Sequence, residues 1–167
     1  RYSVENLFLA LEERYPLGSD DAYLLKTPCV FDVSVAELFG WFAGDGGRLV
    51  VLKNADEKDA AAILTAVETF GITHINFVPA MFNAFLEVLT VNDVRHLEAL
   101  KYIFLAGEAI WPESVKQFRA FETDTRIENL YGPTEATVYA SWYPVELWKG
   151  MGSVSIGKPV DNLKLYI

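Results

Sequence analysis

The sequence predicts an α/β fold in which helices flank a mainly parallel sheet. Apolar runs rich in strand formers alternate at least five times with segments whose apolar residues recur at helical spacing. The strand-like runs are apolar throughout, which is typical of parallel strands buried on both faces. The chain has 167 residues, of which 51% are hydrophobic, and can therefore bury a core. Because no internal repeat or Ser/Gly linker divides it, we expect residues 1–167 to form a single α/β unit.

Five segments carry the signals of helices. Ser3 precedes the first, and either Asp32 or Ser34 can cap the second. Gly71 stands where the third should end, and Pro79 can open the fourth. The predicted helices are residues 3 to about 16, 34 to about 43, 56–69, 80–89 and 112–121.

The predicted strands place short polar groups at one edge of the sheet. They are residues 22–27, 48–52, 73–78, 101–106, 126–131 and 138–142, and a further strand-like run, 163–167, ends the chain. An apolar run at this position suggests that the natural protein continues. In open parallel sheets, ligands bind beyond the carboxyl ends of the strands. This rule selects Asp32, Asn76, Gly107 and the pair Thr134 and Glu135.

Charge and cysteine content exclude several classes of partner. The chain has 14 Lys and Arg against 23 Asp and Glu, a net charge of −9, so we expect no nucleic acid and no membrane among its partners. The one cysteine, Cys29, cannot form an internal disulfide, and with two separated histidines it makes no metal-ligand cluster. No apolar run approaches the roughly 20 residues of a membrane span. A reducing, cytoplasmic setting fits these features.

The run Asn129-Leu130-Tyr131-Gly132-Pro133-Thr134-Glu135 joins a strand to a tight turn that presents a hydroxyl beside a carboxylate. Such a turn can hold polar groups rigidly at a nucleotide or its metal. The residues alone favour a structural role, in which Thr134 caps a short helix and Glu135 complements its dipole.

Four motifs, in the same order and spacing, resemble the adenylation domains of nonribosomal peptide synthetases, within the acyl-adenylate-forming, AMP-binding superfamily. They are residues 129–135, Leu105-Ala106-Gly107-Glu108-Ala109, Phe31-Asp32-Val33-Ser34 and Ile156-Gly157-Lys158-Pro159. The resemblance covers essentially the whole chain. It implies an enzyme that uses ATP and Mg²⁺ to convert an amino acid to an aminoacyl-adenylate and pyrophosphate, and then passes the acyl group to the phosphopantetheine thiol of a carrier protein.

The resemblance also assigns nucleotide contacts. It implies that Tyr131 stacks on adenine, that Asn129 hydrogen-bonds the adenine amino edge, and that the backbone at Gly107 and Glu108 lines the same pocket. Glu108 could instead be a solvated loop acid. Thr134 would contact the α-phosphate and Glu135 would coordinate Mg²⁺, and both act on the charge that develops when the carboxylate attacks that phosphate.

The amino acid itself is assigned to a second group of residues. Asp32 corresponds to the carboxylate that pairs with the substrate's α-ammonium; its alternative role is to cap the helix near Ser34. None of the matching side-chain pocket residues is charged, so a charged substrate side chain would be buried without a partner and we expect a neutral amino acid. The pocket residues are Val33, Ala36, Asn76, Phe104, Ala106, Leu130, Val138 and Tyr139.

The family's other parts do not lie within these residues. We expect the phosphate loop, the ribose-binding region and the C-terminal subdomain with its catalytic lysine to be absent from residues 1–167, and the chain to be inactive in isolation. Two alternatives remain open. One is a member that activates an aryl or fatty acid, which has no α-ammonium, and the other is a non-catalytic α/β binding domain.

Overall fold

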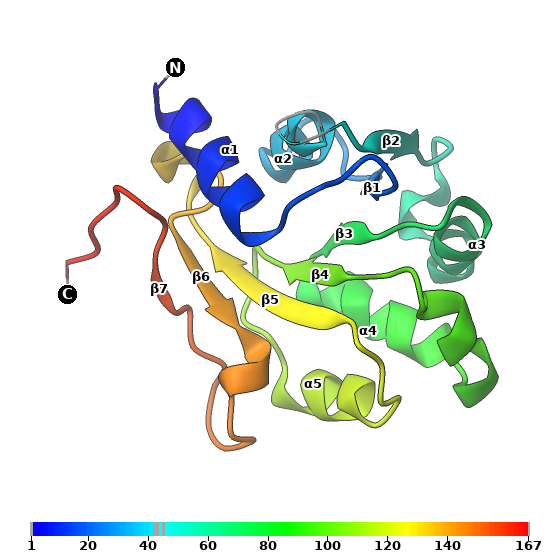
Figure 1. Ribbon diagram of the computed structural model, residues 1–167. Coiled ribbons are helices and arrows are strands. Elements are labelled where there is room, and N and C mark those ends of the chain that lie inside the picture. Colours follow the sequence, from blue (N-terminus) through cyan, green and yellow to red (C-terminus); the bar gives the residue numbers. More distant parts are fainter. Residues whose placement is uncertain (1, 42–43, 45, 167) are drawn as a thin grey trace.

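A seven-stranded sheet organises the molecule, with strand order β2-β1-β3-β4-β5-β6-β7. The computed structural model describes residues 2–41, 44 and 46–166 (Figure 1). Strands β1 to β5 pair in parallel, whereas β6 and β7 are added antiparallel at one edge. This arrangement confirms the predicted α/β class. The strands are β1 Ala22–Leu25, β2 Arg48–Val51, β3 His74–Phe77, β4 Tyr102–Leu105, β5 Arg126–Tyr131, β6 Ser141–Pro144 and β7 Lys158–Pro159.

Helices cover both faces of this sheet. The α-helices are α1 Tyr2–Arg14, α2 Val33–Gly40, α3 Ala60–Phe70, α4 Pro79–Val88 and α5 Pro112–Arg119. In Figure 1, α1 and α2 lie on one side of the sheet and α4 and α5 on the other. Short 3-10 helices occupy Asp56–Lys58, Val91–Leu97, Thr134–Ala136 and Val145–Leu147.

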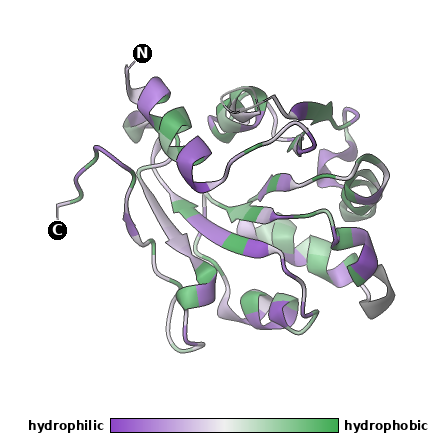
Figure 2. Ribbon diagram, in the orientation of Figure 1, coloured by the Kyte–Doolittle hydropathy of each residue, from purple (hydrophilic) through white to green (hydrophobic). Residues whose placement is uncertain are grey.

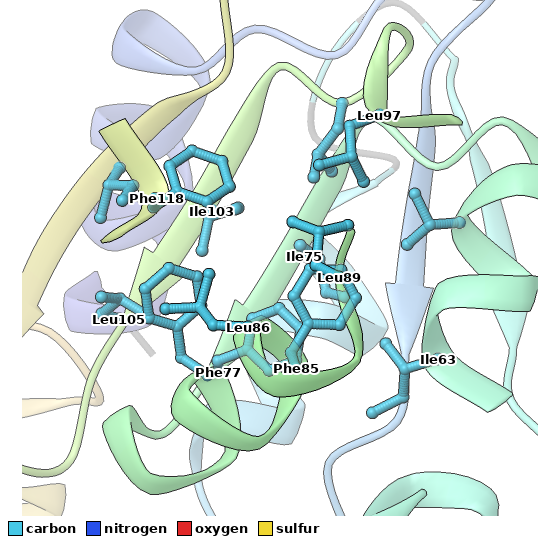
Figure 3. Packing of buried hydrophobic residues seen from close by; sticks show 14 of the residues in the cluster. Ile63, Ile75, Phe77, Phe85, Leu86, Leu89, Leu97, Ile103, Leu105 and Phe118 are labelled. Carbon is cyan, nitrogen blue, oxygen red and sulfur yellow. The ribbon is translucent and has the colours of Figure 1, made fainter. Parts of the chain in front are cut away.

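The alternation of side chains along each strand separates two cores. Ile75 and Phe77 of β3 and Ile103 and Leu105 of β4 join the larger core, where they meet residues of α3, α4 and α5 such as Phe85 (Figure 3). The intervening positions of the same strands point to the opposite face, under α1 and α2, where a smaller cluster forms. Figure 2 shows both hydrophobic and hydrophilic residues along α1, whose buried residues include Leu7 and Ala10.

Several helix ends differ from the predictions. Helix α1 already includes Ser3, so this residue is not its N-cap. The predicted helix 56–69 is divided, because Asp59 adopts an extended backbone and its carboxylate accepts hydrogen bonds from the N–H groups of Ala61 and Ala62. Gly71 ends α3 in the left-handed conformation, as predicted. The second helix ends at Gly40, and the predicted end at Ala43 lies outside the described residues.

Two predicted strands need correction. The strand expected at 138–142 is β6, which begins only at Ser141, because Thr137 and Val138 have positive φ angles of 66° and 67° and cannot continue a strand. In the terminal run, residues 163–166 form no strand. Among the described residues, no helix is both long and apolar enough to span a membrane.

Candidate active site

Asp32 lies at the start of α2, beyond the carboxyl end of β1. Its backbone is already helical, with φ −64° and ψ −24°, and its side chain makes no capping hydrogen bond. The hydroxyl of Ser34, the other candidate cap, donates instead to the carbonyl of Phe31 at 2.7 Å. The Oδ2 atom of Asp32 is buried and has no hydrogen-bond partner. A buried carboxylate oxygen without a partner is costly, so this side chain is suited to a ligand that brings a donor.

The predicted side-chain pocket residues come together beside Asp32. With the exception of Asn76, they all belong to the smaller hydrophobic cluster on the face covered by α1 and α2. They come from α2, from β4 and the residue after it, from β5, and from the segment that leads into β6. These residues are Val33, Ala36, Phe104, Ala106, Leu130, Val138 and Tyr139.

Asn76, the remaining pocket residue, is part of a buried polar network. The Tyr139 hydroxyl donates to Asn76 Oδ1 at 3.3 Å, and Asn76 Nδ2 donates to the Tyr23 hydroxyl at 3.1 Å and to Glu37 Oε1 at 3.4 Å. Burial, reinforced by the neighbouring Tyr23, Glu37 and Asp32, raises the pKa of Tyr139 well above its ordinary value, so the hydroxyl keeps its proton.

The turn at residues 132–140 sets the position of Tyr139. A Cβ on Gly132 would lie 2.5 Å from the Val138 carbonyl oxygen and 2.7 Å from the Ala140 nitrogen, so only glycine allows this backbone contact. The N–H of Ala140 donates to the carbonyl of Tyr131 at 2.7 Å and closes the turn. Positive φ angles at two β-branched residues are strained, and such strain is concentrated at functional sites.

Thr134 and Glu135 lie on the outside of the same turn, and both are exposed. Thr134 is the first residue of the 3-10 helix Thr134–Ala136 rather than its cap, which is Pro133. Glu135 borders a groove of about 580 Å³ between α1, this turn and residues 160–165, and Tyr139 lines the same groove. One short turn therefore supplies residues both to an open groove and to the buried cluster.

The predicted adenine contacts lie at the ends of β4 and β5. Tyr131 is the last residue of β5 and its side chain is 46% exposed, so its ring is accessible for stacking. Asn129 is buried, and its amide nitrogen donates to the Ser155 carbonyl at 2.8 Å, which leaves its carbonyl oxygen to accept from an amino group. Gly107 and Glu108 follow β4 and are exposed. Leu105 of β4 pairs with Asn129 of β5. Gly107 and Tyr131 each lie two residues after this pair, and therefore at the same level of the sheet edge.

The chain offers few ligands for a metal. No group of three or more His, Cys, Asp or Glu side chains converges among the described residues. The exposed carboxylate of Glu135 beside an open groove fits Mg²⁺, because this ion is commonly held by one or two carboxylates together with substrate phosphates and water.

Sequence reasoning missed Glu37, which is completely buried at the site. Its Oε2 accepts from the backbone N–H groups of Lys26 and Thr27, and its Oε1 accepts from the Thr27 hydroxyl. The signal was an acidic residue five positions after Asp32, next to the buried Ala36 in α2. Glu37 thus ties the loop that leads to Asp32 onto α2 and β3.

Two further buried titratable groups lie deeper under the same face. His74 is fully buried, with a pKa lowered to about 4 chiefly by burial, and its ring stacks on Tyr23. This position indicates a structural role for the ring. Burial raises the pKa of Glu128 to about 7, although the Tyr15 hydroxyl donates to its Oε2 at 3.0 Å.

Comparison with known proteins defines the class to which this fold and turn belong. The family model described as AMP-binding enzyme matches residues 1–167, so the chain belongs to the AMP-binding enzyme family. Within that family it is a fragment of an adenylation domain of the nonribosomal-peptide-synthetase type.

Curated relatives support this membership. The chain is 48% identical to the polyketide synthase PksN of Bacillus subtilis, over 99% of the chain but 3% of the relative. It is 39% identical to enterobactin synthase component F of Escherichia coli, over 99% of the chain and 13% of the relative. It is 38% identical to zwittermicin A synthase ZmaJ of Bacillus cereus, over 94% of the chain and 31% of the relative. The chain thus spans a minor part of each of these proteins.

Solved structures agree in fold. The nonribosomal peptide synthetase FmoA3, in an α-methyl-L-serine-AMP bound form, superposes with a TM-score of 0.86 at 24% identity, over 96% of this chain and 18% of that one. The adenylation domain AlmE of Vibrio cholerae gives 0.83 at 24% identity, over 95% of this chain and 29% of that one.

Proposed function

We propose that this chain forms the amino-acid and adenine pocket of an enzyme that activates an amino acid with ATP. The products are an aminoacyl-adenylate and pyrophosphate, and the acyl group then passes to a carrier-protein thiol. The observation that carries this proposal is the buried Oδ2 of Asp32, which has no partner and lies beside an apolar cluster. An α-ammonium group would supply the missing donors and charge, while the rest of the substrate enters the cluster.

The nucleotide assignments follow from the strand ends. The accessible ring of Tyr131 would stack on adenine, and Asn129 would accept from its amino group. Thr134 would donate to the α-phosphate, Glu135 would hold Mg²⁺ at the groove, and the backbone of Gly107 and Glu108 would line the adenine site. Bound Mg²⁺ would neutralise charge on the phosphates. The structures of AlmE with glycyl-adenosine-5'-phosphate and of FmoA3 with AMPPNP are consistent with this chemistry.

The phosphate loop, the ribose-binding region and the C-terminal subdomain would come from the remainder of the protein. Because the pocket is then incomplete, the isolated chain is expected to give no pyrophosphate exchange. Detectable exchange by residues 1–167 alone would contradict this point.

The test of the activity is ATP–pyrophosphate exchange by the complete enzyme, with amino acids compared against the same acids lacking the amino group, such as alanine against propionate. Exchange should require the amino group.

Asp32→Asn should lower kcat/KM for the amino acid by about 100-fold, because it removes one partner of a desolvated charge pair, and should leave the KM for ATP nearly unchanged. Asp20→Asn, at an exposed carboxylate before β1, is the matched control. Equal exchange with propionate would indicate an acid-activating relative, and no exchange with any acid would favour a binding domain.

A further inference from the structure

The pocket of the proposed amino-acid site is already filled by its own side chains. Ala36, Asn76, Phe104, Leu130 and Tyr139 are each at most 3% exposed, although they belong to the cluster or network beside Asp32. Asp32 and Val33, in contrast, remain partly accessible at the rim. A substrate can therefore reach the carboxylate, but little space lies behind it.

Helix α2 forms one side of the space behind Asp32. Asp32, Ala36 and Gly40 are spaced by one helical turn each and so share one side of the helix. A cavity of about 20 Å³ lies between α1, α2 and the sheet, and its lining includes Ala36 and Gly40 of α2, Phe104 and Leu130 of the sheet, and Tyr139. A cavity of this volume holds about one water-sized or methyl-sized group.

Tyr139 and Ala36 belong to the same buried cluster and line this cavity together. The Tyr139 ring is 2% exposed, and its hydroxyl is held by Asn76. Asn76 is in turn bonded to Tyr23 and Glu37, both of which are buried. The backbone on either side is fixed by the close contact with Gly132. Displacement of the ring would break this hydrogen bond and disturb a strained turn, so the ring is a fixed wall of the pocket.

The same network uses the hydrogen-bond donors that the pocket could offer to a substrate side chain. The Tyr139 hydroxyl donates to Asn76 Oδ1, and the Asn76 amide nitrogen donates to two other acceptors. The remaining pocket residues Phe104, Ala106 and Leu130 carry no polar side-chain atoms. A hydroxyl or amide on the substrate would be buried with poor compensation.

We propose that the activated amino acid is glycine or alanine, and that Tyr139, held by Asn76, sets this size limit. This inference rests on the proposed amino-acid activation and adds its substrate class. Asn76 and Tyr139 are the two predicted pocket residues whose side chains carry polar groups. In the structure, these two groups satisfy each other.

The first test uses the complete, unaltered enzyme and a panel of amino acids in pyrophosphate exchange. Glycine or alanine should exceed valine, leucine and phenylalanine by at least about tenfold in kcat/KM, and alanine should exceed serine by about tenfold, the discrimination typical of one excluded group. A preference for leucine, phenylalanine or serine would overturn the size limit while leaving amino-acid activation intact. Equal exchange with propionate and alanine would instead contradict the α-ammonium assignment, so the two failures are distinguishable.

The second test changes the wall itself. Tyr139→Ala should raise the ratio of leucine to alanine activity by at least about tenfold, because it opens the space now filled by the ring. Tyr139→Phe, which keeps the ring, should continue to exclude leucine. Phe85→Ala, a similar truncation in the core on the opposite sheet face, is the control for general loosening and should leave the ratio unchanged.

If thermal unfolding shows that the Tyr139→Ala enzyme is folded and its ratio of leucine to alanine activity is unchanged, the role of Tyr139 is refuted. If that variant does not fold, the substrate panel still decides the proposal.

Discussion

Glu37 and Thr27 are joined by two hydrogen bonds: the Thr27 N–H donates to Glu37 Oε2 at 2.8 Å, and the Thr27 hydroxyl donates to Oε1 at 2.7 Å. The Lys26 N–H donates to the same Oε2 at 3.0 Å. Because Glu37 is fully buried on α2, these bonds hold the start of the loop that ends at Asp32. The position of Asp32, the proposed partner of the α-ammonium, therefore depends on a second carboxylate, that of Glu37.

Truncation of this side chain should be costly. Glu37→Ala leaves two backbone donors and a hydroxyl without their acceptor, at about 1–3 kcal/mol for each unsatisfied group, and is expected to lower the free energy of unfolding by about 4 kcal/mol. Glu37→Gln should cost less, about 2 kcal/mol, since the amide oxygen can face the two N–H groups and the Thr27 hydroxyl can turn to accept from the amide nitrogen, although this nitrogen then loses the long hydrogen bond from Asn76 Nδ2. Urea unfolding of the complete adenylation domain measures both.

A functional readout separates positioning from stability alone. In folded Glu37→Gln enzyme, the KM for the amino acid should rise more than the KM for ATP, because the loosened loop carries Asp32. Glu87→Ala, at an exposed glutamate of α4, is the control and should change stability by no more than about 0.5 kcal/mol. Glu37→Ala with unfolding like that control would show that the loop does not depend on this carboxylate.

The α/β class and the layering of helices on a mainly parallel sheet could be predicted because strand formers and helical spacing alternate clearly, whereas the strand order comes from the structure alone. Asn76, Phe104 and Leu130 were grouped by the family resemblance, and the strands that carry them were predictable to within two residues at each end. The division of residues 56–69 was not anticipated, because Asp59 acts as a cap in the middle of a run of good helix formers.

The site was harder to predict where its geometry depends on contacts distant in sequence. The start of β6 could not be inferred, because the positive φ of Thr137 and Val138 is imposed by the packing of Gly132 on this turn rather than by their own preferences. Similarly, Asn76 appeared to be available to a substrate, and only the structure shows that Tyr139 and Tyr23 occupy its amide.

Gly132 should not tolerate a side chain. In Gly132→Ala the new Cβ would meet the Val138 oxygen at 2.5 Å and the Ala140 nitrogen at 2.7 Å, so the backbone carrying Tyr139 must shift. We expect a loss of about 2 kcal/mol in the free energy of unfolding, together with a higher KM for the amino acid. Gly18→Ala, whose Cβ would lie 3.9 Å from the nearest atom outside its neighbours, is the control. Identical unfolding curves for the two variants would argue against a tight turn.

Glu128 should make stability depend on pH in the direction opposite to most carboxylates. Burial, aided by Glu146 and opposed by the Tyr15 hydrogen bond and Arg126, raises its folded pKa from 4.5 to about 7. The protonated form is favoured in the folded state, so its contribution is complete below pH 4.5 and is lost as pH rises through 7. The difference between these pKa values corresponds to about 3 kcal/mol over this window.

Glu128→Gln isolates this effect, because the amide oxygen can still accept from Tyr15 and nothing titrates. Unfolding free energies at pH 5 and pH 8 should show that the variant is more stable than the unaltered protein at pH 8, by an amount that shrinks at pH 5. Glu113→Gln, at a largely exposed glutamate of α5, should leave the pH dependence as it is. A Glu128→Gln protein with the original pH profile would mean that Glu128 is ionised in the folded state.

Glu135 should determine the magnesium requirement. Glu135→Gln keeps the size of the side chain but removes the charge that would bind Mg²⁺ beside the phosphates, so the Mg²⁺ concentration for half-maximal exchange in the complete enzyme should rise by about tenfold or more. Because Glu135 is exposed, the substitution should change stability little. The urea midpoint should remain within error of that of the unaltered protein. The control is Glu87→Gln, which lies on the distant helix α4 and should leave the Mg²⁺ titration unchanged. Glu146→Gln is unsuitable as a control because Glu146 contributes to the raised pKa of Glu128. A Glu135→Gln enzyme with the original Mg²⁺ titration would remove this carboxylate from the metal site and leave the phosphates and residues outside this chain as the ligands.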